Sequence, residues 1–196
     1  MLKERLTAFS DGVIAIIITI MVLELKAPHE DTLRALAPLA PTFLAYALSF
    51  AYIAIYWNNH HHLFQATRRI SGGILWANTH LLFWLSLVPF STAWLSETSF
   101  ARAPVALYGL SLLAPAIAYF LLSRALIRTE ALAPKVAEGI GADLKGWISM
   151  AFYVCGVALA FANPYASMGL YALVAVIWFI PDRRIEQRLD LEDEPE

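Results

Sequence analysis

Six long apolar blocks dominate this sequence, and they limit what the chain can fold into. The hydrocarbon core of a bilayer is about 30 Å thick and takes roughly 20 helical residues to cross. The blocks are continuous rather than alternating, which favours helices over the strands of a membrane β-barrel. The sequence therefore predicts an all-α integral membrane protein with six transmembrane helices. These cover residues 6–25, 33–60, 73–95, 103–127, 144–161 and 165–180.

Composition supports a membrane protein and argues against a nucleic-acid partner. The chain is 59% hydrophobic and 15% charged, whereas a typical soluble domain is about 25% charged. Its formal net charge of −2 offers no basic surface to nucleic acid. Cys155 is the single cysteine, so no intrachain disulfide is possible. The first block contains Asp11 and lacks a small-residue cleavage site, so we expect a retained span rather than a cleaved signal.

Prolines refine three of the predicted segments. Pro38 and Pro41 lie near the start of the second segment. Because proline is tolerated in the first turn of a helix, this span is expected to begin near Pro41. Pro115 is expected to interrupt the fourth segment. A short Ala-Asn-Pro-Tyr-Ala stretch joins the last two segments, which are therefore predicted to form an antiparallel hairpin.

Basic residues between the segments predict the orientation of the chain. An even number of spans leaves both termini on one side, and the side richer in Lys and Arg faces the cytoplasm. The side of the termini holds eleven such residues: Lys3, Arg5, Arg68, Arg69, Arg124, Arg128, Lys135, Lys145, Arg183, Arg184 and Arg188. The other side holds three: Lys26, Arg34 and Arg102. Both termini are predicted to be cytoplasmic, with residues 1–182 as the six-helix transmembrane domain and residues 183–196 as an acidic cytoplasmic tail.

The first segment carries Asp11 inside its apolar run. A charged side chain is costly in a bilayer and is seldom placed there without a function. At 100° per residue, Asp11 points away from a broad stripe on the same helix, so we expect side chains of other helices to hold it. A favourable charge near a helix start is the alternative for Asp11, and packing against lipid or core is the alternative for the stripe. The stripe comprises Arg5, Phe9, Gly12, Ile16, Thr19, Ile20 and Leu23.

The densest polar cluster, residues 56–64, reads Tyr-Trp-Asn-Asn-His-His-His-Leu-Phe. One interpretation is an interfacial cap that hydrogen-bonds loops or headgroups, and a second is a pH sensor, because histidine titrates near neutrality. A metal site is disfavoured, because consecutive histidines on a helix point about 100° apart. Together with Asn78 of the third segment, the cluster is predicted to anchor the first helix, with histidine and asparagine side chains as the partners of Asp11. No metal and no cofactor are expected.

Three motifs in successive segments resemble the transmembrane protein 175 family of potassium channels. Residues 5–11 resemble its Arg-x-x-x-Phe-Ser-Asp signature, and residues 57–64 resemble its Trp-x-x-His-His-x-Leu-Phe stretch. Residues 75–95 resemble its third helix, including Asn78 and the Pro89–Phe90 pair. The match extends in order and spacing over roughly the first hundred residues, and beyond them it is limited to hydropathy and helix count.

This resemblance implies a homotetramer in the bacterial plasma membrane, with potassium ions and the lipid bilayer as its partners. The first helix would line the pore, with a constriction at Ile16. His62 departs from the family pattern, because relatives often carry a basic residue there. The implied pore-lining residues are Gly12, Ile16, Thr19, Ile20 and Leu23. The implied polar network that holds the pore helix comprises Arg5, Phe9, Ser10, Asp11, Trp57, His60, His61 and Asn78.

The predicted function is a potassium-permeable cation channel with a hydrophobic constriction, and not an enzyme. The chain lacks a Thr-Val-Gly-Tyr-Gly filter, so selectivity cannot come from rings of backbone carbonyls as in ordinary potassium channels. A secondary transporter or proton pathway using Asp11 and the histidine cluster is the main alternative, although no inverted repeat is present. A metal-dependent membrane enzyme and a membrane protein without transport activity are the remaining alternatives.

Overall fold

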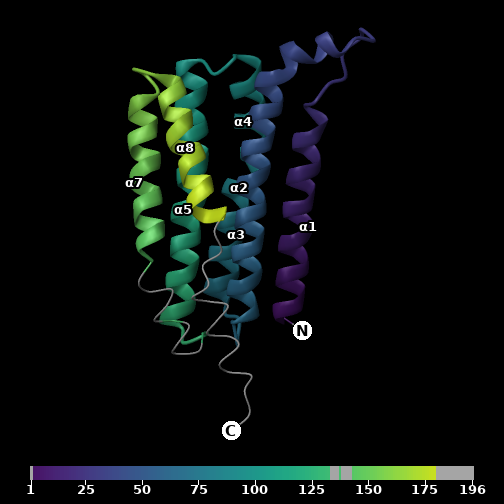
Figure 1. Cartoon of the computed structure of the whole chain (residues 1–196). Helices are drawn as coiled ribbons and strands as arrows, with labels where there is room; N and C mark the ends of the chain where they lie inside the picture. Colours follow the sequence, from purple (N-terminus) through teal and green to yellow (C-terminus); the bar gives the residue numbers. More distant parts are fainter. Residues whose placement is uncertain (1, 133–136, 138–142, 180–196) are drawn as a thin grey trace.

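The computed structural model describes residues 2–132, 137 and 143–179. These residues form a bundle of helices that run side by side (Figure 1). Within this part of the chain, the extended backbone pairing is limited to an isolated bridge between Thr67 and Leu132. The helical elements are α1 (Leu2–Leu23), the short 3-10 helix η1 (Leu33–Leu39), α2 (Ala40–Gln65), α3 (Gly72–Ser86), α4 (Val88–Glu97), α5 (Arg102–Arg128), α7 (Leu144–Leu159) and α8 (Pro164–Phe179).

The prediction of an all-α membrane protein is confirmed. The helices α7 and α8 are apolar but shorter than a full span, with 16 residues each. They pack against each other as the predicted hairpin. The predicted tail, residues 183–196, and the last residues of the predicted membrane domain lie outside the described residues. Among the described residues, four stretches are long and apolar enough to cross a membrane: Lys3–Leu23, Leu33–Gln65, Gly72–Glu97 and Arg102–Arg128.

Prolines mark where several helices begin and break. The helix α2 carries Pro41 in its first turn, as predicted, and Pro38 lies in the 3-10 helix before it. The predicted third segment is two helices that meet at Leu87, because Pro89 has no N–H to donate and occupies the first turn of α4. The predicted interruption at Pro115 is wrong, since α5 continues through it. Pro115 is buried, and a helix that ended there would leave backbone groups unpaired far from water.

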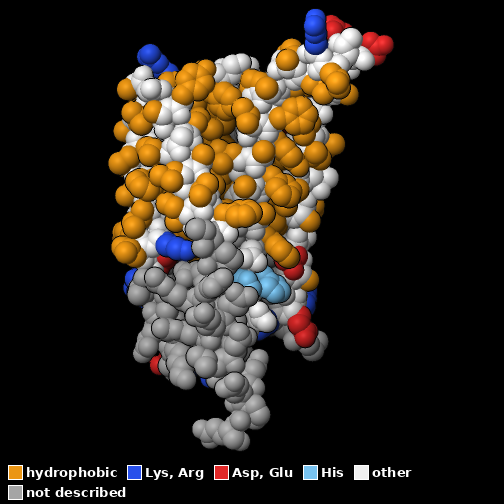
Figure 2. Space-filling model, viewed as in Figure 1, with side chains coloured by type: hydrophobic (Ala, Val, Ile, Leu, Met, Phe, Trp, Pro, Cys, Tyr) orange, Lys and Arg blue, Asp and Glu red, His pale blue; other side chains and the backbone are white. Residues whose placement is uncertain are grey.

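The two ends of the bundle are set apart by the connections and charges they carry. The start of α1, the α2–α3 connection, the end of α5 and the start of α7 lie at one end (Figure 1). We call this the basic end, and its described Lys and Arg residues are Lys3, Arg5, Arg68, Arg69, Arg124, Arg128 and Lys145. The opposite end carries Lys26, Arg34 and Arg102. Between the ends, apolar side chains cover the visible face (Figure 2), as expected for helices in contact with lipid.

Close packing of α5, α7 and α8 depends on two glycines. Tyr171 of α8 is fully buried, and its ring lies against Gly109 of α5 and Gly156 of α7. A Cβ atom on Gly109 would lie 2.0 Å from the Tyr171 hydroxyl oxygen, and one on Gly156 would lie 2.3 Å from Tyr171 Cε1. Both separations are far below van der Waals contact. The absent side chains therefore let three helices approach around one tyrosine, as small residues do in other membrane bundles.

Substituting Gly156 with alanine is expected to destabilise this part of the bundle, because the added methyl group displaces the Tyr171 ring. Overpacking a core costs about 1–3 kcal/mol, so the melting temperature of the detergent-purified protein should fall by several degrees. Gly169→Ala is the matched control, since a Cβ atom there meets no atom within 4 Å. Equal melting temperatures for the two variants would contradict the packing argument.

Candidate functional site

The helix α1 lies at the edge of the bundle and packs against α2, α3 and α4 (Figure 1). Its buried residues recur every three or four positions, which places them on one helical face. The apolar members of this face are each at most 5% exposed. The face therefore holds α1 on its neighbours within the chain. It comprises Leu6, Ser10, Ile14, Ile17 and Met21.

The opposite side of α1 is open. Phe9 and Ile16 are each 60% exposed, and Leu23 is 70% exposed. A Cβ atom on Gly12 would meet no atom within 4 Å, so no described residue packs there. The structure thus leaves uncovered the whole stripe of Arg5, Phe9, Gly12, Ile16, Thr19, Ile20 and Leu23.

A buried chain of hydrogen bonds joins α1 to α3 and α2. Asn78 Nδ2 donates to Ser10 Oγ at 2.9 Å, and Ser10 Oγ donates to the backbone oxygen of Leu6 at 2.9 Å. His60 Nε2 lies 2.7 Å from Asn78 Oδ1. A carboxamide oxygen only accepts, so His60 carries its proton on Nε2 and donates. The pairing of polar groups on three helices fixes α1 in both rotation and height, because each group would be costly to leave unpaired in an apolar core.

Asp11 is held differently from what the sequence suggests. We expected histidine and asparagine side chains as its partners, but Trp57 Nε1 of α2 donates to Asp11 Oδ1 at 3.0 Å. Asp11 follows Ser10 by one residue and therefore faces about 100° away from the Ser10–Asn78–His60 chain. His61 lies beside the same tryptophan, with ring centroids 6.0 Å apart. Asp11, Trp57 and His61 are all exposed, so this second contact lies on the surface of the helix bundle.

The remaining members of the predicted network have separate surroundings. Arg5 is exposed and forms no hydrogen bond or ion pair with the described residues. It lines a groove between α1 and α3 together with Phe9 and Thr79. Of the three consecutive histidines, only His60 is buried, and its ring stacks at 4.5 Å on Phe64. Within the described part of the chain, no group of three or more His, Cys, Asp or Glu residues is placed to hold a metal ion.

Lys3 makes a contact between helices that no sequence pattern predicts. Its Nζ atom donates to the backbone oxygens of Gln65 and Thr67 at 2.9 and 2.8 Å. These oxygens belong to the end of α2, where carbonyl groups lack partners within the helix. The backbone of Arg68 in turn donates to the Ala131 oxygen at 2.8 Å. Lys3 therefore ties the start of α1 to the α2–α3 connection and, through it, to the end of α5.

Replacing Asp11 with alanine removes the acceptor for Trp57 and is expected to impair assembly or gating more than ion selectivity. The physical reason is that Asp11 does not belong to the exposed stripe. Its hydrogen bond with Trp57 instead positions α1 against α2. Asp11→Asn is the matched variant, because an amide oxygen still accepts the indole N–H. The measurement is the oligomeric state in detergent, followed by potassium and sodium flux in liposomes. A changed flux ratio with normal assembly in Asp11→Ala would contradict this role.

Comparison with known proteins places this arrangement in a family. Residues 5–89 match a protein-family model whose description is "endosomal/lysosomal potassium channel TMEM175". A potassium channel of Chryseobacterium sp. (strain P1-3) is 56% identical over 189 residues, which cover 96% of this chain and 98% of that protein. A potassium channel of Chamaesiphon minutus is 33% identical over 184 residues, which cover 88% of this chain and 91% of that protein.

A solved structure supports the same assignment at the level of the fold. It is the crystal structure of a lysosomal potassium-selective channel TMEM175 homologue from Chamaesiphon minutus. It superposes with a TM-score of 0.76 and is 31% identical, covering 91% of this chain and 96% of that chain. The same family is indicated by the three motifs on α1, α2 and α3, by the full-length relatives and by the shared fold. The chain is a multi-pass membrane protein that belongs to the TMEM175 family.

Proposed function

We propose that this chain forms a potassium-permeable channel whose pore is lined by the exposed stripe of α1. The observation that carries the proposal is the contrast between the two sides of that helix. One side is buried on the bundle, and the other exposes apolar side chains together with Gly12 and Thr19. The similar full-length proteins are named potassium channels, which supports the same activity here.

Several copies of the chain are needed to make such a pore, because one helix cannot enclose an ion path. Four copies arranged around a common axis would turn four α1 stripes inward and remove the exposed Phe9 and Ile16 side chains from contact with lipid. We therefore infer a homotetramer, in keeping with closed symmetry as the usual rule for identical subunits. A purified protein that is monomeric in native mass spectrometry would contradict the proposed pore.

Ile16 is the proposed constriction, near the middle of the stripe. Four isoleucine side chains around the pore axis offer no oxygen to replace the water that an ion sheds. The ion with the lower dehydration cost therefore passes more easily. Potassium loses its water at a lower cost than sodium because it is larger. Small movements of these four side chains can open or close the path by wetting and dewetting.

Thr19 supplies a polar site one turn beyond the constriction. Its hydroxyl donates to the backbone oxygen of Ala15 at 2.8 Å. The donated proton points into the helix, which leaves the lone pairs of Thr19 Oγ1 free to face a cation. Four such oxygens would compensate in part for the water lost at Ile16, which lies three residues earlier and about 4.5 Å away along the axis.

The proposed orientation places the basic end in the cytoplasm of a bacterial cell. This proposal is supported by the larger number of described Lys and Arg residues at the basic end. The acidic tail, residues 183–196, would then extend into the cytoplasm. A membrane-impermeant thiol reagent applied to intact cells should label a cysteine placed at Asp31 and should spare one placed at Arg69. The reverse pattern would contradict this orientation.

The experiment that tests the channel is ion flux through the purified protein in liposomes. A potassium gradient should drive flux that protein-free liposomes lack, and a sodium gradient of the same size should drive less. Flux that is proportional to the ion gradient over a wide concentration range indicates a channel. Saturable flux coupled to a proton or a second ion would instead favour the transporter alternative and overturn the proposal.

A further inference from the structure

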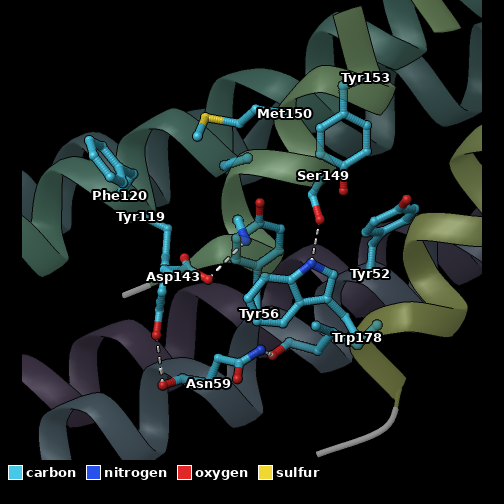
Figure 3. Close-up of a pocket in the computed structure, with 13 residues that line it drawn as sticks. Tyr52, Tyr56, Asn59, Tyr119, Phe120, Asp143, Ser149, Met150, Tyr153 and Trp178 are labelled. Carbon is cyan, nitrogen blue, oxygen red and sulfur yellow. Dashed lines mark hydrogen bonds between the residues drawn. The ribbon is translucent and has the colours of Figure 1, made fainter. Parts of the chain in front are cut away.

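A second candidate site lies inside each subunit, away from the proposed pore. A cavity opens between α2, α5, α7 and α8 near the basic end, and no residue of α1 lines it (Figure 3). Aromatic side chains supply much of its wall. They are Tyr52 and Tyr56 of α2, Tyr119 and Phe120 of α5, Tyr153 of α7 and Trp178 of α8.

Three of these rings donate their O–H or N–H to other groups of the protein. They therefore offer the cavity no hydrogen-bond donor. The Tyr52 hydroxyl donates to the backbone oxygen of Tyr171 at 2.6 Å, and the Tyr119 hydroxyl donates to the backbone oxygen of Asn59 at 3.2 Å. Trp178 Nε1 donates to Ser149 Oγ at 2.8 Å. The faces of aromatic rings and the oxygens of hydroxyl groups carry partial negative charge, and both attract cations.

Asp143 is the charged residue that lines the cavity. Its Oδ1 atom accepts from the backbone N–H of Gly146 at 2.8 Å, which caps the start of α7. Its Oδ2 atom makes no hydrogen bond with any described residue. Figure 3 shows this carboxylate beside Tyr119, at the edge of the space that Tyr56 and Trp178 also border. A carboxylate that lines a cavity next to aromatic rings is a site for a cation.

Two basic residues of the chain already contact aromatic rings that line the cavity. The Arg124 guanidinium lies 5.0 Å from the centroid of the Phe120 ring, and Lys145 Nζ lies 6.0 Å from that of Trp178. Neither residue lines the cavity. These contacts show that both rings are placed to attract cations.

The size of the cavity limits the ligand. The space open to the centre of a water molecule is about 50 Å³. One water needs about 10–15 Å³ of such space, so the cavity holds a few waters or a ligand of a few heavy atoms. A lipid chain or a drug-sized molecule is too large without movement of the helices, whereas a methylated ammonium group is of suitable size.

We propose that this cavity binds a small organic ammonium cation, with aromatic rings around the methylated nitrogen and Asp143 as the counter-charge. Aromatic side chains and a carboxylate together are the usual means of recognising such cations. Bound ligand stabilises the folded protein, because the cavity is formed by four helices that separate on unfolding.

Choline is the probe for this proposal, and 3,3-dimethyl-1-butanol is its uncharged analogue of nearly the same shape. Choline should bind the purified full-length protein saturably in calorimetry and should raise its melting temperature, relative to sodium chloride at equal ionic strength. The neutral alcohol should bind at least tenfold more weakly. Equal binding of the two compounds would overturn the role of charge, and an absence of saturable choline binding would overturn the site.

Asp143→Asn is the deciding variant, because asparagine caps a helix as well as aspartate does but carries no charge. It should melt at the same temperature as the wild type without choline and should bind choline at least tenfold more weakly. Asp31→Asn removes the same charge from an exposed residue outside the cavity and should bind choline normally. Choline that binds in the proposed pore would be unaffected by Asp143→Asn, and that result would also overturn the proposal.

Discussion

Substituting Ile16 with asparagine is expected to lower the potassium-to-sodium permeability ratio about tenfold. Ile16 is 60% exposed on the open stripe of α1, and we propose that four copies meet there. An asparagine amide supplies oxygens that replace lost water, so the higher dehydration cost of sodium no longer excludes it. A tenfold change corresponds to about 1.4 kcal/mol in the difference between the two ions. The measurement is the flux of each ion in liposomes, or the reversal potential under bi-ionic conditions.

Val22→Asn is the matched control for this experiment. Val22 is an exposed apolar residue of the same helix, 42% exposed, but it faces about 120° away from Ile16 around the axis. Its replacement introduces the same amide without placing it in the proposed pore. An unchanged flux ratio for Ile16→Asn would show that the constriction lies elsewhere. Equal changes in both variants would assign the effect to a general loss of packing.

Substituting Asn78 with leucine is expected to destabilise α1 in its position more than any other single change in the polar network. Leucine has a similar size but leaves His60 Nε2 and Ser10 Oγ without their interhelical partner in a buried site. A buried polar group without a partner costs about 1–3 kcal/mol in soluble proteins, and interhelical bonds in membranes average nearer 0.6 kcal/mol. We expect a loss of about 2 kcal/mol, which corresponds to a fall in melting temperature of about 4–8 °C.

Thr79→Val is the control, because Thr79 is the exposed neighbour of Asn78 and its hydroxyl bonds only the Leu75 oxygen of its own helix. It should melt within a degree or two of the wild type. The Asn78 variant should also lose flux, since α1 lines the proposed pore. A variant that melts normally and conducts normally would contradict the role of the Ser10–Asn78–His60 chain as the anchor of α1.

Much of the fold could be predicted from local physics. Apolar length sets the spans, because a bilayer requires about 20 helical residues, and the described helices begin and end close to the predicted limits. Pro41 lies in a first turn, as predicted, because a missing N–H does no harm there. Pro89 also lies in a first turn, but the break before it was not predicted. The predicted interruption at Pro115 is wrong, because the apolar surroundings of α5 favour a continuous helix over an exposed backbone.

The candidate site could be predicted only in part. Helical phase groups Ile16 with the rest of its stripe from sequence alone. Phase does not say which face a subunit buries, since Ile14 and Ile17 are as apolar as Ile16 and yet are 2% and 3% exposed. That difference comes from the position of α1 at the edge of the bundle, where α2, α3 and α4 cover one side only.

The sequence by itself determined the membrane class, the order and approximate positions of the apolar segments, and the family resemblance, because these follow from hydropathy and short motifs. Only the tertiary structure decided that Asp11 meets Trp57, that Lys3 caps α2, and that Asp143 borders an aromatic cavity. These contacts join residues far apart in the chain, and they depend on how whole helices rotate and slide against each other. No local pattern specifies that, because many rotations bury similar amounts of apolar surface and differ only in which polar groups they pair.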